Sequence, residues 1–141
     1  MQKRQMWFLI LVIGLGLSLL SCSGSESFAP KSIGGKKYQV VITGGSGEMT
    51  DTGNATIAFA MNGSYVVTGD GVNTSNDLGT YTYNKTGKNT GAFTLNSTLL
   101  KGYQESNIFE FVNKKSGTYK AKTLTGDPGD QAGNFNEIEV Q

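Results

Sequence analysis

Large hydrophobic residues recur at every second position through most of this 141-residue chain. Successive side chains of a β-strand point to opposite faces, whereas a helical face needs a period of 3.6 residues. No twelve-residue window after Lys36 has the helical period, so we predict an all-β protein. The residues expected to face inward form eight runs: Tyr38, Val40 and Ile42; Ile57, Phe59 and Met61; Tyr65 and Val67; Tyr81 and Tyr83; Phe93 and Leu95; Phe109 and Phe111; Tyr119 and Ala121; and Phe135, Ile138 and Val140.

Glycine-bearing turns separate these runs, as at Gly44-Gly45, Asn62-Gly63, Thr86-Gly87 and Ser116-Gly117. Glycine supplies the positive φ angle that tight hairpins need. Eight short strands with short connections imply an antiparallel meander, which can close into a small up-and-down barrel. The alternative is a two-sheet sandwich. Because the inward positions carry many aromatic rings, we expect the interior of the barrel to be packed.

The first residues have the features of an export signal. Lys3 and Arg4 precede an uncharged run of 15 residues that ends at Leu20. A membrane-spanning helix needs about 20 residues, so a secretory signal peptide is favoured. The run ends in Leu19-Leu20-Ser21-Cys22, which resembles the lipobox of bacterial lipoproteins. The resemblance implies that residues 1–21 are removed, and that Cys22 carries a diacylglycerol and an acyl group such as palmitate. A plain secretory signal that contains a cysteine is the alternative.

The residues after the lipobox differ in composition from the runs that follow them. Residues 22–35 are polar and contain glycine, serine and proline, so we predict a lipidated flexible tether before an antiparallel β domain of residues 36–141. In lipoproteins of this kind, an aspartate after the cysteine commonly marks retention in the inner membrane, but Ser23 stands there. By this resemblance we expect an extracytoplasmic, membrane-anchored lipoprotein, with the outer membrane favoured over the inner.

The composition excludes several kinds of site. The chain has no histidine, one cysteine, and 12 basic against 11 acidic residues. Histidine is the commonest metal ligand and general base, so a zinc site, a Ser–His–Asp triad and a Cys–His pair are excluded. The balanced charge argues against nucleic acid as a partner. Carboxylates remain for acid–base chemistry, but Glu110, between Phe109 and Phe111, is expected to face solvent. We therefore predict neither an enzyme nor a cofactor.

Two stretches resemble modules found in secreted bacterial proteins. Residues 79–95 (GTYTYNKTGKNTGAFTL) are similar to the first half of Gly/Thr/Tyr-rich β modules, and residues 109–119 (FEFVNKKSGTY) are similar to their second half. The resemblance implies a β fold outside the cytoplasm and assigns no activity. In outline, the predicted meander is also similar to lipocalin-like barrels.

Two groups of residues are candidates for binding. If the barrel is hollow, seven aromatic residues would line its cavity: Tyr38, Phe59, Tyr65, Tyr83, Phe93, Phe111 and Tyr119. Asp70, Asn73 and Asp77 gather oxygen atoms in one polar stretch, as calcium sites do. Turn residues also gather such side chains to bond their own backbone, so we predict no metal site there.

Three functions are compatible with these observations. The first is a non-enzymatic lipoprotein of the cell envelope, anchored in the membrane through lipid on Cys22 and acting as a structural or binding module for an envelope protein or polysaccharide. The second is a lipocalin-like carrier of a small apolar ligand. The third is a carboxylate-dependent hydrolase, which needs two carboxylates close together in a cleft. We favour the first, because the lipobox is present and the usual catalytic residue types are lacking.

Overall fold

The computed structural model describes residues 24–140, so the apolar run and Cys22 lie outside the described residues. Within that range it contains eight strands: β1 (Lys37–Gly47), β2 (Gly53–Phe59), β3 (Ser64–Gly69), β4 (Asp77–Lys85), β5 (Thr90–Ser97), β6 (Gln104–Phe111), β7 (Ser116–Thr123) and β8 (Gly129–Ile138). Residues 24–140 include no helix long and apolar enough to cross a membrane.

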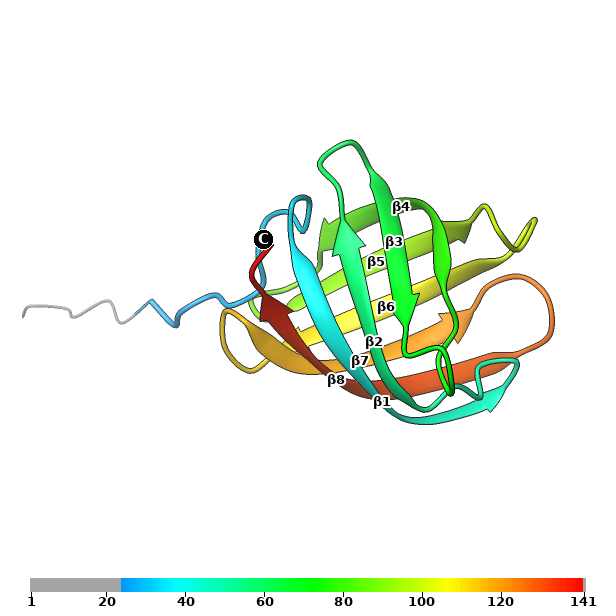
Figure 1. Ribbon diagram of the computed structural model, residues 1–141. Coiled ribbons are helices and arrows are strands. Elements are labelled where there is room, and N and C mark those ends of the chain that lie inside the picture. The colour runs from blue at the N-terminus through cyan, green and yellow to red at the C-terminus, as the bar shows by residue number, and fades with distance from the viewer. Residues whose placement is uncertain (1–23, 141) are drawn as a thin grey trace, which may run out of the picture.

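The strands form one closed antiparallel barrel (Figure 1). Each strand pairs with the next along the chain, and β1 closes the barrel by pairing with β8, with Tyr38 opposite Glu137 and Val40 opposite Phe135. This confirms the up-and-down barrel and excludes the two-sheet sandwich. Four loops lie at one end of the barrel, here called the mouth: residues 48–52, 70–76, 98–103 and 124–128. The other three turns, the start of β1 and the end of β8 lie at the opposite end, here called the closed end.

Aromatic rings fill the half of the barrel nearest the closed end. Phe109 lies at the centre of this cluster, stacked on Phe135 with a distance of 4.0 Å between ring centroids. Phe93 and Tyr38 meet Phe109 edge-on at 4.8 and 5.3 Å. The rings of Tyr38, Phe109, Phe111 and Phe135 are almost completely buried. Since edge-to-face and offset pairs add to the hydrophobic free energy of burial, this cluster is the main source of stability.

A segment before the first strand covers the closed end. Ala29 and Ile33 are buried against the aromatic cluster, with exposed fractions of 3% and 0%. The amide of Ala29 donates to the Lys88 carbonyl (3.0 Å), and the Tyr83 hydroxyl donates to the Pro30 carbonyl (2.8 Å). The tether expected over residues 22–35 is therefore too long at its C-terminal side. Residues 28–35, which we call the N-terminal plug, belong to the folded domain.

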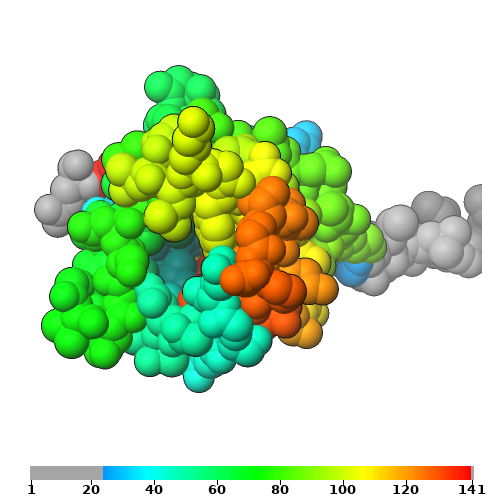
Figure 2. Space-filling view, turned by 90° about the vertical axis from the view of Figure 1, so that its right-hand side faces the viewer, coloured from blue at the N-terminus to red at the C-terminus, as the bar shows by residue number. Residues whose placement is uncertain are grey.

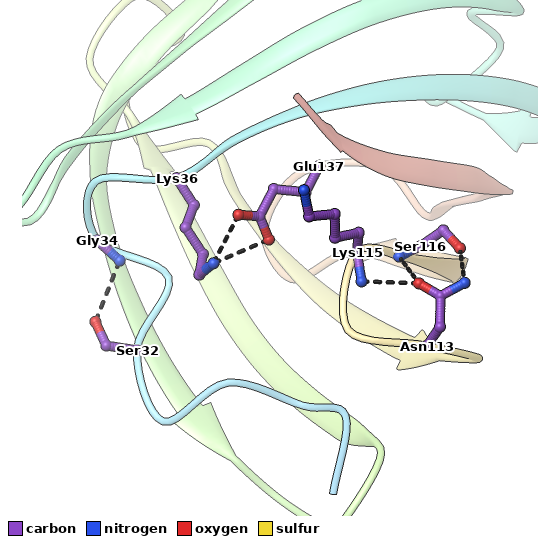
Figure 3. A network of polar contacts seen from close by, with 7 residues as sticks. All are labelled: Ser32, Gly34, Lys36, Asn113, Lys115, Ser116 and Glu137. Atoms are coloured by element: carbon purple, nitrogen blue, oxygen red, sulfur yellow. Dashed lines mark hydrogen bonds and ion pairs between the residues drawn. The ribbon is translucent and has the colours of Figure 1, made fainter. Parts of the chain in front are cut away.

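Polar contacts join Lys36, the residue that follows the plug, to the last strand (Figure 3). The ammonium of Lys36 lies 2.8 and 2.9 Å from the two carboxylate oxygens of Glu137 in β8. The amide of Glu137 donates to the Lys115 carbonyl in the turn between β6 and β7 (2.6 Å). These contacts hold the start of β1, the end of β8 and a neighbouring turn together, so the closed end is fastened by polar contacts as well as packed.

Three expected inward positions at strand ends are wrong. Met61 (84% exposed) lies in the turn after β2, and Val140 (66% exposed) follows β8. Within β8, Phe135 and Glu137 are two residues apart and share the inner face, which puts Ile138 on the outer face. All three errors arise because apolar residues near the end of a strand need not follow the period of that strand.

Candidate functional site

The half of the barrel nearest the mouth is hollow. A cavity of about 760 Å³ opens between the four mouth loops, where Figure 2 shows a hollow in the surface. This volume falls within the range of about 300–1,000 Å³ that is typical of small-molecule sites. The expectation of a packed interior is therefore correct for the closed end and wrong for the mouth.

The cavity exists because the inward side chains become smaller or more polar toward the mouth. In β1 they pass from Tyr38 to Val40 and Ile42, and in β2 from Phe59 to Ile57 and Ala55. In β6, Phe111 and Phe109 give way to Asn107 and Glu105. Large rings thus meet across the barrel at one end, whereas the shorter chains at the other end leave space. The floor of the cavity is apolar and is formed by Val40, Ile57, Phe93, Leu95 and Phe109.

One wall of the cavity carries two carboxylates. Asp77, at the start of β4, accepts hydrogen bonds from the hydroxyls of Tyr65 (2.5 Å) and Ser97 (2.6 Å). Glu105, near the start of β6, accepts from the side-chain amide of Asn107 (2.9 Å) and the Tyr103 hydroxyl (3.2 Å). These neutral donors hold the two carboxylates in fixed positions on either side of β5.

Burial affects the ionisation of Glu105 and Tyr65. It raises the pKa of the Glu105 carboxyl, and the charge of Asp77 adds to that effect. Burial also raises the pKa of the Tyr65 hydroxyl, and its hydrogen bond to Asp77 acts in the same direction. The Tyr65 hydroxyl therefore keeps its proton well above the pH at which a free tyrosine ionises, and it remains a donor to Asp77 at neutral pH.

The opposite wall carries the neutral side chains of Tyr119 and Gln131, and at the rim Asp51 ties two mouth loops together. The Tyr119 hydroxyl donates to the side-chain carbonyl of Gln131 (3.1 Å). Asp51, in the loop between β1 and β2, accepts from the amide of Ser75 in the loop between β3 and β4 (3.0 Å). Met49 is buried below this contact. The rim of the cavity is thus supported by contacts between loops that are distant in sequence.

The seven candidate ligand-lining aromatics divide between the two halves of the barrel. Phe93 and Tyr119 line the cavity, and Tyr65 contacts it through its hydrogen bond to Asp77. The other four lie toward the closed end: Tyr38, Phe59 and Phe111 in the aromatic cluster, and Tyr83 against the N-terminal plug. Asp77 was a calcium candidate and not a predicted cavity residue, and neither Glu105 nor Asn107 was predicted. Their place on the inward face of a strand was the available signal.

The structure separates the calcium candidates. One oxygen of Asp70 accepts hydrogen bonds from the amides of Val72, Asn73 and Thr74, which lowers the pKa of the Asp70 carboxyl to about 2. The carboxylate of Asp77 instead faces Tyr65 and Ser97. Asp70 thus organises its own turn. Among residues 24–140, no three histidine, cysteine or acidic residues are grouped as a metal site would require.

Replacing Glu105 with glutamine is expected to stabilise the domain at neutral pH. Because the pKa of Glu105 is raised on folding, the folded state favours the protonated form. The stability that the Glu105 carboxyl contributes is fully present below its pKa in the unfolded chain. It is lost as the pH rises through its pKa in the folded protein. The advantage of Glu105→Gln over the wild type should therefore be small near about pH 4 and larger at about pH 7. Urea unfolding at both pH values measures it, and an advantage that shrinks as the pH rises would contradict it.

The site is interpreted from its own geometry. No protein-family model, curated protein or solved structure matches this chain. The cavity combines an apolar floor with two fixed carboxylates and a neutral far wall, while Glu110 is exposed on the outside of β6. Such a lining can hold a small molecule by its apolar part and orient it by its polar part.

Proposed function

We propose that this protein is a non-enzymatic, extracytoplasmic lipoprotein that is anchored through lipid on Cys22 and binds a small ligand in the mouth cavity. The observation that carries the binding role is the cavity of about 760 Å³ above a packed aromatic floor. The lipobox, Leu19-Leu20-Ser21-Cys22, supports the anchor, with the outer membrane favoured. Two or more acyl chains are needed for stable anchoring, and a modified lipobox cysteine supplies them.

Binding accounts for the cavity better than hydrolysis does. Asp77 and Glu105 do lie in one cavity, which is the minimum that we required of a carboxylate hydrolase. Each, however, is already engaged by two donors of the protein itself. A substrate would lie against an aliphatic and aromatic floor that has no further group for acid–base chemistry. This arrangement favours retention of a ligand over its conversion.

A Cys22→Ser variant tests the anchor. Without the thiol the diacylglycerol has no attachment point, so the variant should leave the detergent-rich phase in phase separation, whereas the wild type should stay in it. Metabolic labelling with palmitate should mark the wild type alone. A variant that still partitions with detergent would contradict anchoring through Cys22.

Filling the cavity tests the binding role. Native mass spectrometry of the domain purified from its own host should show an added mass that denaturation removes. Ala55 faces the cavity and Ala58 lies on the same strand facing outward, so Ala55→Trp should abolish the added mass and Ala58→Trp should retain it.

A bare mass for the wild type would contradict a carrier. It would favour an envelope partner that binds at the mouth rim. Four apolar residues there are more than half exposed: Val72, Leu99, Leu100 and Leu124. Crosslinking in cells would identify that partner.

A further inference from the structure

The cavity has an uncompensated negative charge. Asp77 and Glu105 face its interior, and Glu48 and Asp51 stand at its mouth. Lys101 is the one basic residue of the lining, and it is exposed in the loop between β5 and β6. The two ion pairs among residues 24–140 are Lys36–Glu137 and Lys114–Glu26, and neither involves a residue of the cavity. No cation of the described protein therefore neutralises Asp77 or Glu105.

The two interior carboxylates, Asp77 and Glu105, lie on the same wall of the cavity. Asp77 is bonded to Ser97 of β5, and Glu105 pairs with Leu95, two residues earlier on the same strand. The hydroxyl of Tyr103 donates to Glu105. Burial raises the pKa of this hydroxyl, and the charges of Glu105 and Asp77 raise it further. Their charges therefore add at one place, beside the apolar floor formed by Phe93 and Leu95.

Hydrogen bonds from neutral donors do not remove the cost of burying like charges. Coulomb interactions strengthen as the surrounding dielectric constant falls, so a positive group in this position would be attracted more strongly than one at the surface. Hydrogen bonds to charged groups are also the stronger kind. A cation at this wall would relieve the repulsion between the carboxylates, which an anion would increase.

We propose that the ligand of the cavity is an amphiphilic organic cation. Its ammonium group lies at Asp77 and Glu105, and its apolar chain or ring lies on the floor formed by Ile57, Phe93 and Leu95. This inference rests on the proposed binding function and specifies the ligand class for that site. A neutral apolar ligand would use the floor and leave the acidic wall unpartnered.

Three probes with the same eight-carbon chain test the proposal: octylammonium, octanol and octanoate, each titrated calorimetrically into the domain of residues 24–140 at neutral pH. We expect octylammonium to bind about ten- to a hundredfold more tightly than octanol, which is the range for adding charged hydrogen bonds. Octanoate should bind most weakly. These comparisons use the wild type and do not depend on any variant.

Variants of the two carboxylates then test whether these residues supply the negative charge that octylammonium recognises. Glu105→Gln and Asp77→Asn keep the shape of each side chain and remove its charge, so each should reduce the octylammonium preference about tenfold or more. Glu110→Gln is the matched control, because Glu110 is exposed on the outer face of the same strand as Glu105. It should leave the preference unchanged, and a loss of preference in this control would overturn the assignment to the cavity wall.

The outcomes separate this inference from the proposed function. Equal affinities for octylammonium and octanol, or tighter binding of octanoate, would overturn the cationic ligand and leave a cavity that binds apolar molecules. Failure of all three probes to bind would also overturn it. The proposed function would in that case be decided by the mass of the protein purified from its host.

Discussion

Phe109→Ala is expected to reduce the free energy of unfolding by about 3–5 kcal/mol. Phe109 stacks on Phe135 and meets four further rings of the aromatic cluster. Its removal would extend the mouth cavity down into the packed half, and the surrounding rings are held by strands that cannot close the space. Small domains have a total stability of about 5–15 kcal/mol, so urea denaturation should show a large shift of the midpoint.

The neighbouring residue provides the control. Ile108 lies on the outer face of β6 and is 49% exposed, so Ile108→Ala should cost less than about 1 kcal/mol. If the two substitutions reduced stability equally, the aromatic cluster would not be the main stabilising element of the barrel.

Gly133→Ala is expected to destabilise the barrel by about 3 kcal/mol, although it adds a single methyl group. A Cβ atom at Gly133 would lie 2.0 Å from the carbonyl oxygen of Val41 and 2.7 Å from a ring carbon of Tyr119. Gly133 pairs with Ile42 of β1 and with Tyr119 of β7. Since the obstructing oxygen belongs to the paired backbone, it can retreat only by weakening the contact between β1 and β8 that closes the barrel.

Gly44→Ala is the matched substitution in β1. No atom lies within 4 Å of a Cβ at Gly44, so the added methyl group should be neutral or should stabilise the domain by up to about 1 kcal/mol. Thermal unfolding of both variants beside the wild type makes the comparison. Equal unfolding temperatures for the two variants would contradict the close approach at Gly133.

The alternation of residues was sufficient to predict the strands, and their short connections favoured a barrel, with a two-sheet sandwich as the alternative. Phe109 and Phe111 on either side of Glu110 specify one inner and one outer face, and turn glycines such as Gly63, whose φ angle is +86°, mark a chain reversal. Such information is local, because each strand pairs with the next along the chain. An up-and-down barrel is therefore among the folds most readily predicted from a single sequence.

The turns predicted from glycine are only partly correct. Gly63 lies in a turn, as predicted, but Gly117, which was also predicted to lie in a turn, lies within β7 and faces inward, as Gly79 does within β4. A Cβ at Gly79 would lie 1.9 Å from the carbonyl oxygen of Asn96 on β5 and 3.1 Å from a ring carbon of Tyr65, its partner on β3. This glycine makes room for both neighbouring strands, a relation between strands that no local pattern contains.

The plug and the cavity also depend on relations between distant residues. Ile33 lies in a stretch whose glycine and serine content resembles a linker, and it is buried in the hydrophobic cluster that contains Phe59 and against which Tyr83 packs. The cavity depends on the order of large and small inward residues in several strands at once. Each strand taken alone, such as Tyr38, Val40 and Ile42, reads as an ordinary core strand.

The position of the plug determines how the barrel can be attached to other structures. The plug crosses the closed end, and β8 also ends there, at the end of the barrel opposite the mouth (Figure 1). A lipid on Cys22 would attach the barrel to the bilayer from its closed end, with the mouth directed away from the bilayer. A reporter or a sensor surface joined before the plug or after β8 would likewise leave the mouth unobstructed. Exchange of a ligand would then take place with the aqueous side and not with the supporting membrane.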